Sequence, residues 1–448
     1  MASVRPPAVA GAFYPGEPRA LAAELDELLG GVETAGPHLG FPKALIVPHA
    51  GYIYSGPVAA RAYEELAPAR GIVRRVVLLG PVHRVPVRGL AVPTDAAFAT
   101  PLGTIPIDQE ALASVRDLPQ IVTSDAAHAM EHALEVQLPF LQRQLGAFSL
   151  APFAVGDATV EEVAQVIARL WGGEETLIVI STDLSHYHAY AQARDIDRST
   201  VTRITQLATD LDHGEACGAT PLNGFLHLSK SRDLSVRLLA ACNSGDTAGG
   251  KDRVVGYSAF SLHERASHVS TEDAGRALLG IARAAIEAKL FGNARTVDAP
   301  WLRQSGATFV TLTRDGELRG CIGSLQASRP LGDDVAENAA GAAFRDPRFT
   351  AMTSEEWPSV RVEISLLSTP KPMRFADEAD LLAQIRPGED GLILECDGRR
   401  ATFLPQVWET IPDKRQFLAH LLHKAGLPQG TRLGRCKVWR YRVTKWKE

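Results

Sequence analysis

The sequence predicts an α/β domain, with a mostly parallel sheet covered by helices, followed by a smaller α+β domain. Three observations lead to this prediction. Strand-length apolar runs alternate with helical stretches over the first 265 residues, a polar segment follows, and the remainder holds short strand-like runs divided by turn signals. The length of 448 residues also exceeds one ordinary hydrophobic core, so two or three folding units are expected.

The first domain, residues 1–265, contains apolar runs that are typical of strands buried on both faces of a parallel sheet. Helical stretches separate them, one at 57–66 with Pro57 expected in its first turn, and one at 160–171. The predicted strands are 43–47, 75–79, 176–180, 234–241 and 254–262.

A polar segment at 264–273 separates this domain from the second, which spans residues 270–448. A long helix is expected at 274–290, and turn signals such as Arg314-Asp315-Gly316 fall between some of the later runs. An α+β domain with a partly antiparallel sheet accounts for this pattern. Its predicted strands are 308–313, 360–367, 392–395 and 437–443.

The totals exclude several classes of protein. There are 47 basic and 52 acidic residues, so a basic surface for nucleic acid or membrane lipid is not expected. No apolar run has the roughly 18 residues of a membrane span, and the first residues do not read as a signal peptide. The five cysteines form no CxxC pair, so we expect neither a disulfide framework nor a zinc knuckle. We expect a cytoplasmic location for the same reason.

Polar clusters follow three of the predicted strands of the first domain. His49 comes just after the first strand, His83 after the second, and Asp183 and His186 after the third. The ligand crevice of an open α/β sheet lies outside the carboxyl ends of its strands. We therefore expect these four side chains to share one cleft.

This set of residues suits a metal ion. Imidazole binds iron, copper, nickel and zinc, and two histidines with one carboxylate form the usual non-heme iron site. A further histidine could act as a general acid or base near neutral pH. The alternative is that these are hydrogen-bonded histidines at the starts of loops.

The same residues resemble a known family. The segments 10–15, 48–56, 80–83, 131–132 and 181–186 together are similar to the MEMO family, in order over residues 5–265. The resemblance implies a fold like that of class III extradiol dioxygenases. It also implies that His49 and His83 bind a divalent metal, with iron(II) favoured and copper or zinc as alternatives. His186 would be the acid/base histidine, and Asp183, Glu131 and His132 would support the pocket.

The third metal ligand is a departure from the family pattern. Some MEMO proteins have a cysteine in a late loop where this chain has Thr247, which is a poor ligand. Asp246 is the expected substitute, with Cys242 as the other candidate. We therefore expect Asp246 or Cys242 to approach His49 and His83 from the opposite wall.

A rival motif overlaps this pocket. His128-Ala129-Met130-Glu131-His132 fits H-x-x-E-H, the inverted zinc-peptidase pattern, in which the two histidines share one helix face. The pattern is short, and the resemblance to MEMO proteins accounts for Glu131 and His132 without a peptidase.

The second domain has one prominent motif, Leu318-Arg319-Gly320-Cys321-Ile322-Gly323. Cys321 is a candidate nucleophile if a cation lowers its pKa; the alternative is a tight strand whose small residues serve packing. With 344–349 and 401–408, this string resembles the AMMECR1 family over about residues 275–445.

These two resemblances lead to two hypotheses about function. Proteins similar to each half are grouped with a radical SAM enzyme in the AmmeMemoRadiSam system, so such an enzyme is an expected partner. The first hypothesis is a metal-dependent oxidoreductase acting on an unknown small molecule. The second is a non-catalytic binding or scaffold module that keeps the pocket.

Overall fold

The first domain is built on a nine-stranded sheet whose four central strands, β2, β9, β3 and β8, are parallel. The full order is β10-β12-β2-β9-β3-β8-β4-β7, with β11 paired to β12. Strand β12 is antiparallel to its neighbours β10, β11 and β2, and β4 is antiparallel to β8. The sheet is therefore mixed, with a parallel centre. Its strands are β2 (Ala44–Val47), β3 (Arg75–Pro81), β4 (Leu90–Val92), β7 (Ile121–Thr123), β8 (Ser149–Val155), β9 (Thr176–Ser181), β10 (His186–His188), β11 (Leu234–Asn243) and β12 (Val254–Glu264).

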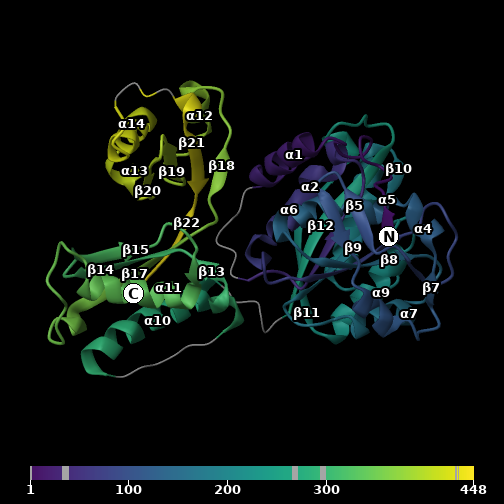
Figure 1. Ribbon diagram of the computed structural model, residues 1–448, viewed down its shortest axis with the longest axis horizontal. Helices are drawn as coiled ribbons and strands as arrows, with labels where there is room; N and C mark the ends of the chain where they lie inside the picture. The colour runs from purple at the N-terminus through teal and green to yellow at the C-terminus, as the bar shows by residue number, and fades with distance from the viewer. Residues whose placement is uncertain (1–2, 33–39, 265–270, 293–298, 429–430, 432) are drawn as a thin grey trace. The chain divides into compact units, whose positions relative to one another are not determined.

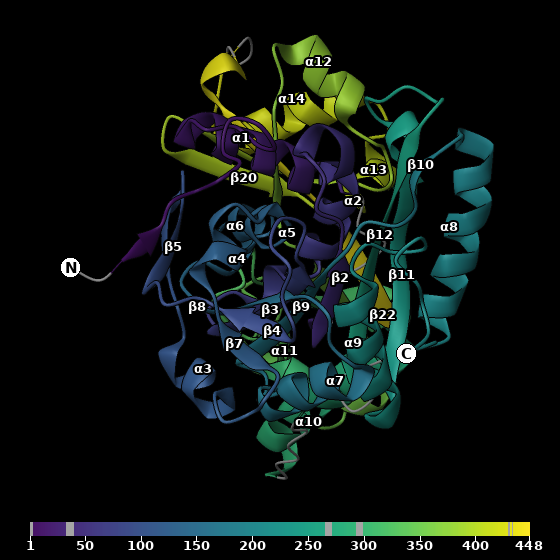
Figure 2. The same ribbon diagram turned by 90° about the vertical axis from the view of Figure 1, so that its right-hand side faces the viewer.

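Helices cover both faces of this sheet, as predicted. Figures 1 and 2 show α1, α2 and α6 on one side of it and α7 and α9 on the other. The helices are α1 (Pro18–Gly30), α2 (Tyr52–Glu64), α3 (Gln109–Val115), α4 (Asp125–Ala129), α5 (His132–Glu135), α6 (Leu138–Leu145), α7 (Val160–Arg169), α8 (Tyr190–Thr205) and α9 (Ala219–Ser231). A small sheet adds β1 (Val4–Arg5), β5 (Ala97–Thr100) and β6 (Gly103–Pro106).

The prediction for the helix after the first strand is wrong at its start. That helix, α2, begins at Tyr52 and contains Pro57 in its interior. The earlier start follows from the neighbouring segment, because the Tyr52 N–H donates to the Phe13 carbonyl (2.8 Å). This bond satisfies one of the N–H groups that a first helical turn leaves without an internal partner.

The computed structural model describes residues 3–32, 40–264, 271–292, 299–428, 431 and 433–448. The chain divides into two compact units, Met1–Val32 with Phe41–His268 and Glu33–Gly40 with Val269–Glu448. Residues 33–39 and 265–270 lie outside the described residues. No helix within the described ranges has the length and apolar character to cross a membrane.

The second unit contains two four-stranded antiparallel sheets, β15-β14-β17-β22 and β18-β21-β19-β20. The predicted strand 437–443 is two strands, one in each sheet, because the Arg442 N–H between them donates to the Ser368 hydroxyl (3.0 Å). The elements are α10 (Thr271–Phe291), β13 (Ser305–Gly306), β14 (Thr308–Arg314), β15 (Glu317–Gly323), β16 (Arg329–Pro330), α11 (Leu331–Phe344), β17 (Val360–Leu367), β18 (Lys371–Met373), α12 (Glu378–Gln384), β19 (Gly391–Cys396), β20 (Arg399–Phe403), α13 (Val407–Thr410), α14 (Lys414–Lys424), β21 (Lys437–Tyr441) and β22 (Val443–Lys447).

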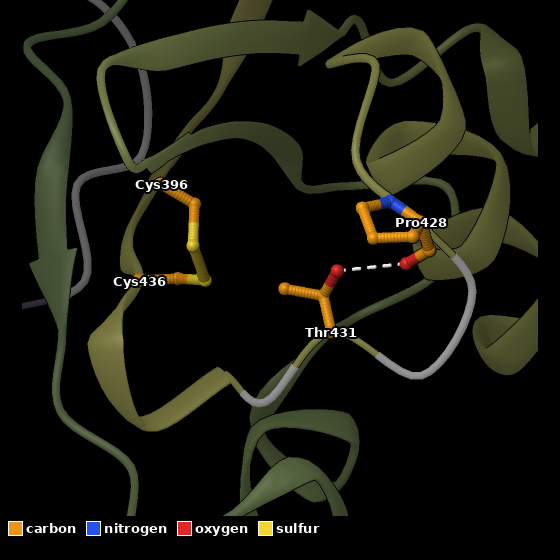
Figure 3. The surroundings of a disulfide bond; sticks show 4 residues. All are labelled: Cys396, Pro428, Thr431 and Cys436. Carbon is orange, nitrogen blue, oxygen red and sulfur yellow. Dashed lines mark hydrogen bonds between the residues drawn. A yellow bond between two sulfur atoms is a disulfide. The ribbon is translucent and has the colours of Figure 1, made fainter.

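One disulfide is present in this unit, although no disulfide framework was expected from the sequence. Cys396 and Cys436 are joined, as Figure 3 shows. They meet because β19 and β21 pair with Glu395 opposite Lys437, so the next residue on each side is also adjacent. Cys217, Cys242 and Cys321 are free thiols.

Candidate metal centre

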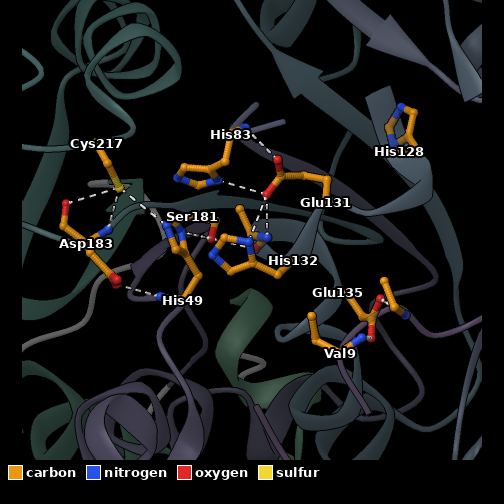
Figure 4. Close-up of polar contacts among 12 residues, drawn as sticks. Val9, His49, His83, His128, Glu131, His132, Glu135, Ser181, Asp183 and Cys217 are labelled. Atoms are coloured by element: carbon orange, nitrogen blue, oxygen red, sulfur yellow. Dashed lines mark hydrogen bonds and ion pairs between the residues drawn. The ribbon is translucent and has the colours of Figure 1, made fainter. Parts of the chain in front are cut away.

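Three imidazoles gather at the carboxyl ends of the central strands. One ring nitrogen each of His49, His83 and His132 lies within 4.8 Å of the others. The ring centroids are 5.2 Å apart for His49 and His83, 5.4 Å for His49 and His132, and 4.7 Å for His83 and His132. Figure 4 shows the three rings gathered together.

Strand polarity accounts for two of the three. His49 lies two residues beyond the end of β2, and His83 two residues beyond the end of β3. Both strands run parallel to β9, which lies between them, so their following loops start on one edge of the sheet. The structure thus brings His49 and His83 together, where the sequence placed them.

The hydrogen bonds of Ser181 determine the tautomer of His49. A hydroxyl has one proton to donate, and the Ser181 hydroxyl donates it to the Ala133 carbonyl (2.7 Å). It therefore accepts from the Gln137 amide (2.9 Å) and from His49 Nδ1–H (2.9 Å). The proton of His49 is then on Nδ1, and Nε2 carries a lone pair.

His49 is also held in its neutral form. Its side chain is buried, and burial lowers its pKa to about 3, helped by the nearby His83 charge. Burial and the charge of His49 likewise lower the pKa of His132 to about 4. Both imidazoles are therefore free of the extra proton that would compete with a metal at neutral pH.

Glu131 orients His83. Its carboxylate accepts the His83 backbone N–H (2.6 Å) and His83 Nδ1–H (2.9 Å), which leaves Nε2 of His83 with a lone pair. Burial raises the pKa of Glu131, but the His83 hydrogen bonds and charge outweigh it and hold the pKa at about 2. His132 Nδ1 lies 3.3 Å from the same carboxylate, without the alignment of a hydrogen bond. A carboxylate behind a histidine is the usual support of a metal ligand.

Asp183 contacts this cluster, and His186 lies within electrostatic range of it. The buried Asp183 carboxylate accepts the His49 backbone N–H (2.7 Å), and burial raises its pKa against the charges of His186 and His132. His186 donates Nδ1–H to the Leu184 carbonyl (2.8 Å), so its Nε2 is left as a proton acceptor. The charge of His186 is also among the causes that lower the pKa of His49, which places it within electrostatic reach.

Cys217 is the site residue that the sequence reasoning missed. Its Sγ lies 3.3 Å from His49 Nε2, and it accepts the Asp183 backbone N–H at 3.3 Å. Burial raises the pKa of this thiol to about 12, with the charge of Asp183 adding to the effect. The loop is held by Gly218, whose N–H donates to Thr182 Oγ1 (2.9 Å). The only sequence signal was a Cys-Gly pair before a helix, which is weak.

The prediction of Asp246 as the third ligand is not supported by its position. Asp246 is exposed, accepts the Asn243 N–H (3.0 Å) and bonds the Tyr190 hydroxyl. It caps a 3-10 turn at Ser244–Asp246 and is not in the three-imidazole group. The physical reason is that β11 pairs antiparallel to β12, off the main path of the sheet, and ends in this surface turn. Neither Cys242 nor Thr247 belongs to the group, and its third member is His132.

The zinc-peptidase arrangement is not formed. The helix of the motif breaks at Met130, so His128 lies in the last turn of α4 while His132 starts α5. His128 donates Nε2–H to the Ala91 carbonyl (2.9 Å) and packs against the ring of Phe98, away from the cluster in Figure 4.

The N-terminal segment with Phe13 and Tyr14 packs against His132 and bonds α5. The ring of Phe13 packs on His132 with centroids 4.9 Å apart. The buried Glu135 accepts the Tyr14 hydroxyl (2.7 Å) and the Arg5 guanidinium (2.7 Å), which ties this segment to α5. Cys321 belongs to the second unit, where its N–H donates to Asp346 (2.8 Å) and its Sγ lies 3.3 Å from Thr311 Oγ1.

The donor set fits a transition metal. Three imidazoles, two of them oriented by hydrogen bonds at Nδ1, match sites for zinc, copper or iron. The buried Nδ1 of His132 makes no hydrogen bond, and the ring lies against Phe13 and the other two imidazoles.

Comparisons with known proteins agree with this architecture. Residues 5–261 match the family model described as Memo-like protein, and residues 279–446 match AMMECR1. A MEMO1 family protein of Methanopyrus kandleri is 38% identical over 280 residues, which cover 57% of this chain and 98% of that protein. One from Aquifex aeolicus is 38% identical over 268 residues, 57% of this chain and 97% of that protein.

A solved structure is also similar to part of the chain. It is an uncharacterized protein of Pyrococcus horikoshii, 33% identical, which covers 39% of this chain and 91% of its own, with a TM-score of 0.36. The family assignment rests on the sequence matches, which span the whole first domain: the chain belongs to the MEMO1 family and carries an AMMECR1 domain after its Memo-like domain.

Proposed function

We propose that the first domain binds one divalent metal ion through His49, His83 and His132 and is an oxidoreductase of the class III extradiol dioxygenase type. Its substrate would be a small aromatic or modified molecule. The observation that carries the proposal is the set of three ring nitrogens within 4.8 Å of one another. Hydrogen bonds to Ser181 and Glu131 leave Nε2 of two of these rings with a lone pair.

The neighbouring groups have distinct tasks in this proposal. A bound iron(II) would supply the chemistry of dioxygen binding and electron transfer. His186 Nε2 accepts a proton from the substrate, because its Nδ1–H is already bonded to Leu184. The buried Asp183 carboxylate holds the His49 backbone in place.

Anaerobic loading tests the proposal. The purified chain is incubated separately with iron(II), copper and zinc, desalted, and analysed for metal per chain. We expect about one ion per chain at micromolar protein, and oxygen uptake by the iron form with catechol-type compounds. Failure to retain any of the three metals would overturn the metal centre.

The second candidate, a non-catalytic binding module, is favoured by one observation. The two-histidine, one-carboxylate set of non-heme iron enzymes is not formed, since Asp246 is exposed on a surface turn. Metal retention without oxygen uptake would support this candidate. A separate radical SAM enzyme stays a proposed partner, and co-purification with this chain is its test.

A further inference from the structure

The Cys217 thiol is hydrogen-bonded to Nε2 of His49, the nitrogen that would bind the metal. Since His49 carries its proton on Nδ1, its Nε2 can only accept, and the Cys217 S–H is the donor at 3.3 Å. One lone pair cannot hold both this proton and a metal ion. Binding of an ion by His49 therefore requires the thiol proton to leave or the thiol to turn away.

We propose that Cys217 stays and becomes the fourth ligand of the centre, as a thiolate. This inference rests on the proposed function, because it needs the ion held by His49, His83 and His132.

The distance favours coordination. A nitrogen about 2.0–2.1 Å and a sulfur about 2.3 Å from one tetrahedral ion are separated by about 3.5 Å. The observed separation of 3.3 Å between Cys217 Sγ and His49 Nε2 is close to that value. The contact is on the His49 side of the cluster, and Cys217 is outside the group whose ligand atoms all lie within 4.8 Å of one another, so coordination requires its side chain to turn toward the other imidazoles.

One backbone donor faces the sulfur, while burial and the charge of Asp183 raise the pKa of the free thiol, so the thiolate forms only with the ion bound. The Asp183 backbone N–H points at Sγ from 3.3 Å and would donate to a bound thiolate, whereas the Thr182 hydroxyl donates to the Asp183 carbonyl (2.8 Å). The loop cannot easily retreat, because it approaches β9 closely: a Cβ on Gly218 would lie 2.8 Å from the Ser181 carbonyl oxygen. Sulfur is thus presented to the cluster by backbone that is held in place.

Coordination by Cys217 releases one proton. The S–H bond breaks, the sulfur keeps the electron pair and donates it to the ion, and the proton goes to solvent. No oxidant or reductant is needed. A soft thiolate among three imidazoles favours copper and zinc over magnesium or calcium, so the site would select transition metals.

Cobalt(II) substitution tests the inference without reference to activity. The full chain is titrated with cobalt(II) under anaerobic conditions, and its visible and near-ultraviolet absorption is recorded. We expect d–d bands together with a thiolate-to-cobalt charge-transfer band. Cys217→Ser should abolish the charge-transfer band and weaken cobalt binding by at least about tenfold.

Matched controls separate the outcomes. Cys242→Ser removes another half-buried free thiol of the same domain and should leave both the band and the affinity unchanged. Cys217→Ala, checked for a normal thermal melt, repeats the test with a variant that has no hydroxyl. Cobalt d–d bands without a thiolate band in the unaltered chain would overturn the role of Cys217 and leave the three-imidazole site standing. No cobalt binding at all would overturn both.

Discussion

At the residue scale, the candidate centre depends on groups that do not themselves face the ion. Ser181 and Glu131 each accept an Nδ1–H, and so decide which nitrogen of His49 and His83 is free. Such supports typically change metal affinity by about 10–100-fold when they are removed. Their contribution can be measured separately from that of the ligands.

Glu131→Gln should weaken metal retention by about 10–100-fold, because the amide gives His83 a weaker and partly mismatched acceptor. Competition with a chelator of known affinity measures this change. Asp246→Asn is the matched control: its carboxylate is exposed on a surface turn, so the affinity should not change. If only the Asp246 variant lost metal, the ligand set described above would be wrong.

His128 makes a second prediction, on pH and stability. Burial lowers its pKa to about 4, from 6.5 for an unperturbed histidine, against the hydrogen bond to Ala91. As the pH falls from 6.5 to 4, His128 takes up a proton in the unfolded chain but stays neutral in the folded chain. The stabilisation is therefore complete above pH 6.5 and is lost as the pH falls toward 4, by about 2 kcal/mol at pH 5.

His128→Gln tests this directly, since glutamine keeps a donor for the Ala91 carbonyl but does not titrate. Urea unfolding at pH 7.5 and pH 5 should show a smaller loss of unfolding free energy in the variant, by about 2 kcal/mol. An equal loss in both proteins would assign the acid sensitivity to other groups.

At the element scale, the site depends on how closely the loop before α9 approaches the end of β9. The Gly218 N–H bonds Thr182, and the Cys217 N–H bonds the Asp183 carbonyl (3.2 Å). These contacts join a loop to a strand end that precedes it by more than thirty residues. They place the Cys217 thiol beside His49.

Gly218→Ala should destabilise the first domain by about 1–3 kcal/mol, because its Cβ would lie 2.8 Å from the Ser181 carbonyl oxygen and from Thr182 Cβ. Denaturant unfolding measures the loss. Gly250→Ala is the control, since nothing lies within 4 Å of a Cβ there, and its effect should stay within about 0.5 kcal/mol. Equal effects of the two substitutions would contradict the close packing at Gly218.

At the scale of the whole molecule, the two units have separate hydrophobic cores. Among the described residues, the main core of the first unit ends at Leu262, and the three clusters of the second unit begin at Ala274. Units with separate cores can fold separately.

Expression of residues 1–265 and 270–448 as separate chains tests this prediction. Each should show the circular dichroism of a folded protein and a cooperative thermal transition, and only the first should retain metal. An unfolded fragment would show that the boundary or the independence of the units is wrong.

The sequence was sufficient to predict the parts of the site whose positions follow from the direction of the strands. His49, His83 and Asp183 each lie two residues past a buried strand of one parallel set, so their common edge could be predicted without coordinates. The alternation of strands and helices was predictable for the same reason: it depends on local hydrophobic pattern, which the chain displays directly.

Only the tertiary structure decided the rest of the site. The break between α4 and α5 turns His132 into the cluster and His128 away, although both belong to one helix-like string. Cys217 reaches His49 only through packing of a distant loop, and β11, paired outside β12, carries Asp246 to the surface. Local pattern specifies the direction of a strand, whereas the meeting of loops depends on contacts between segments far apart in the chain.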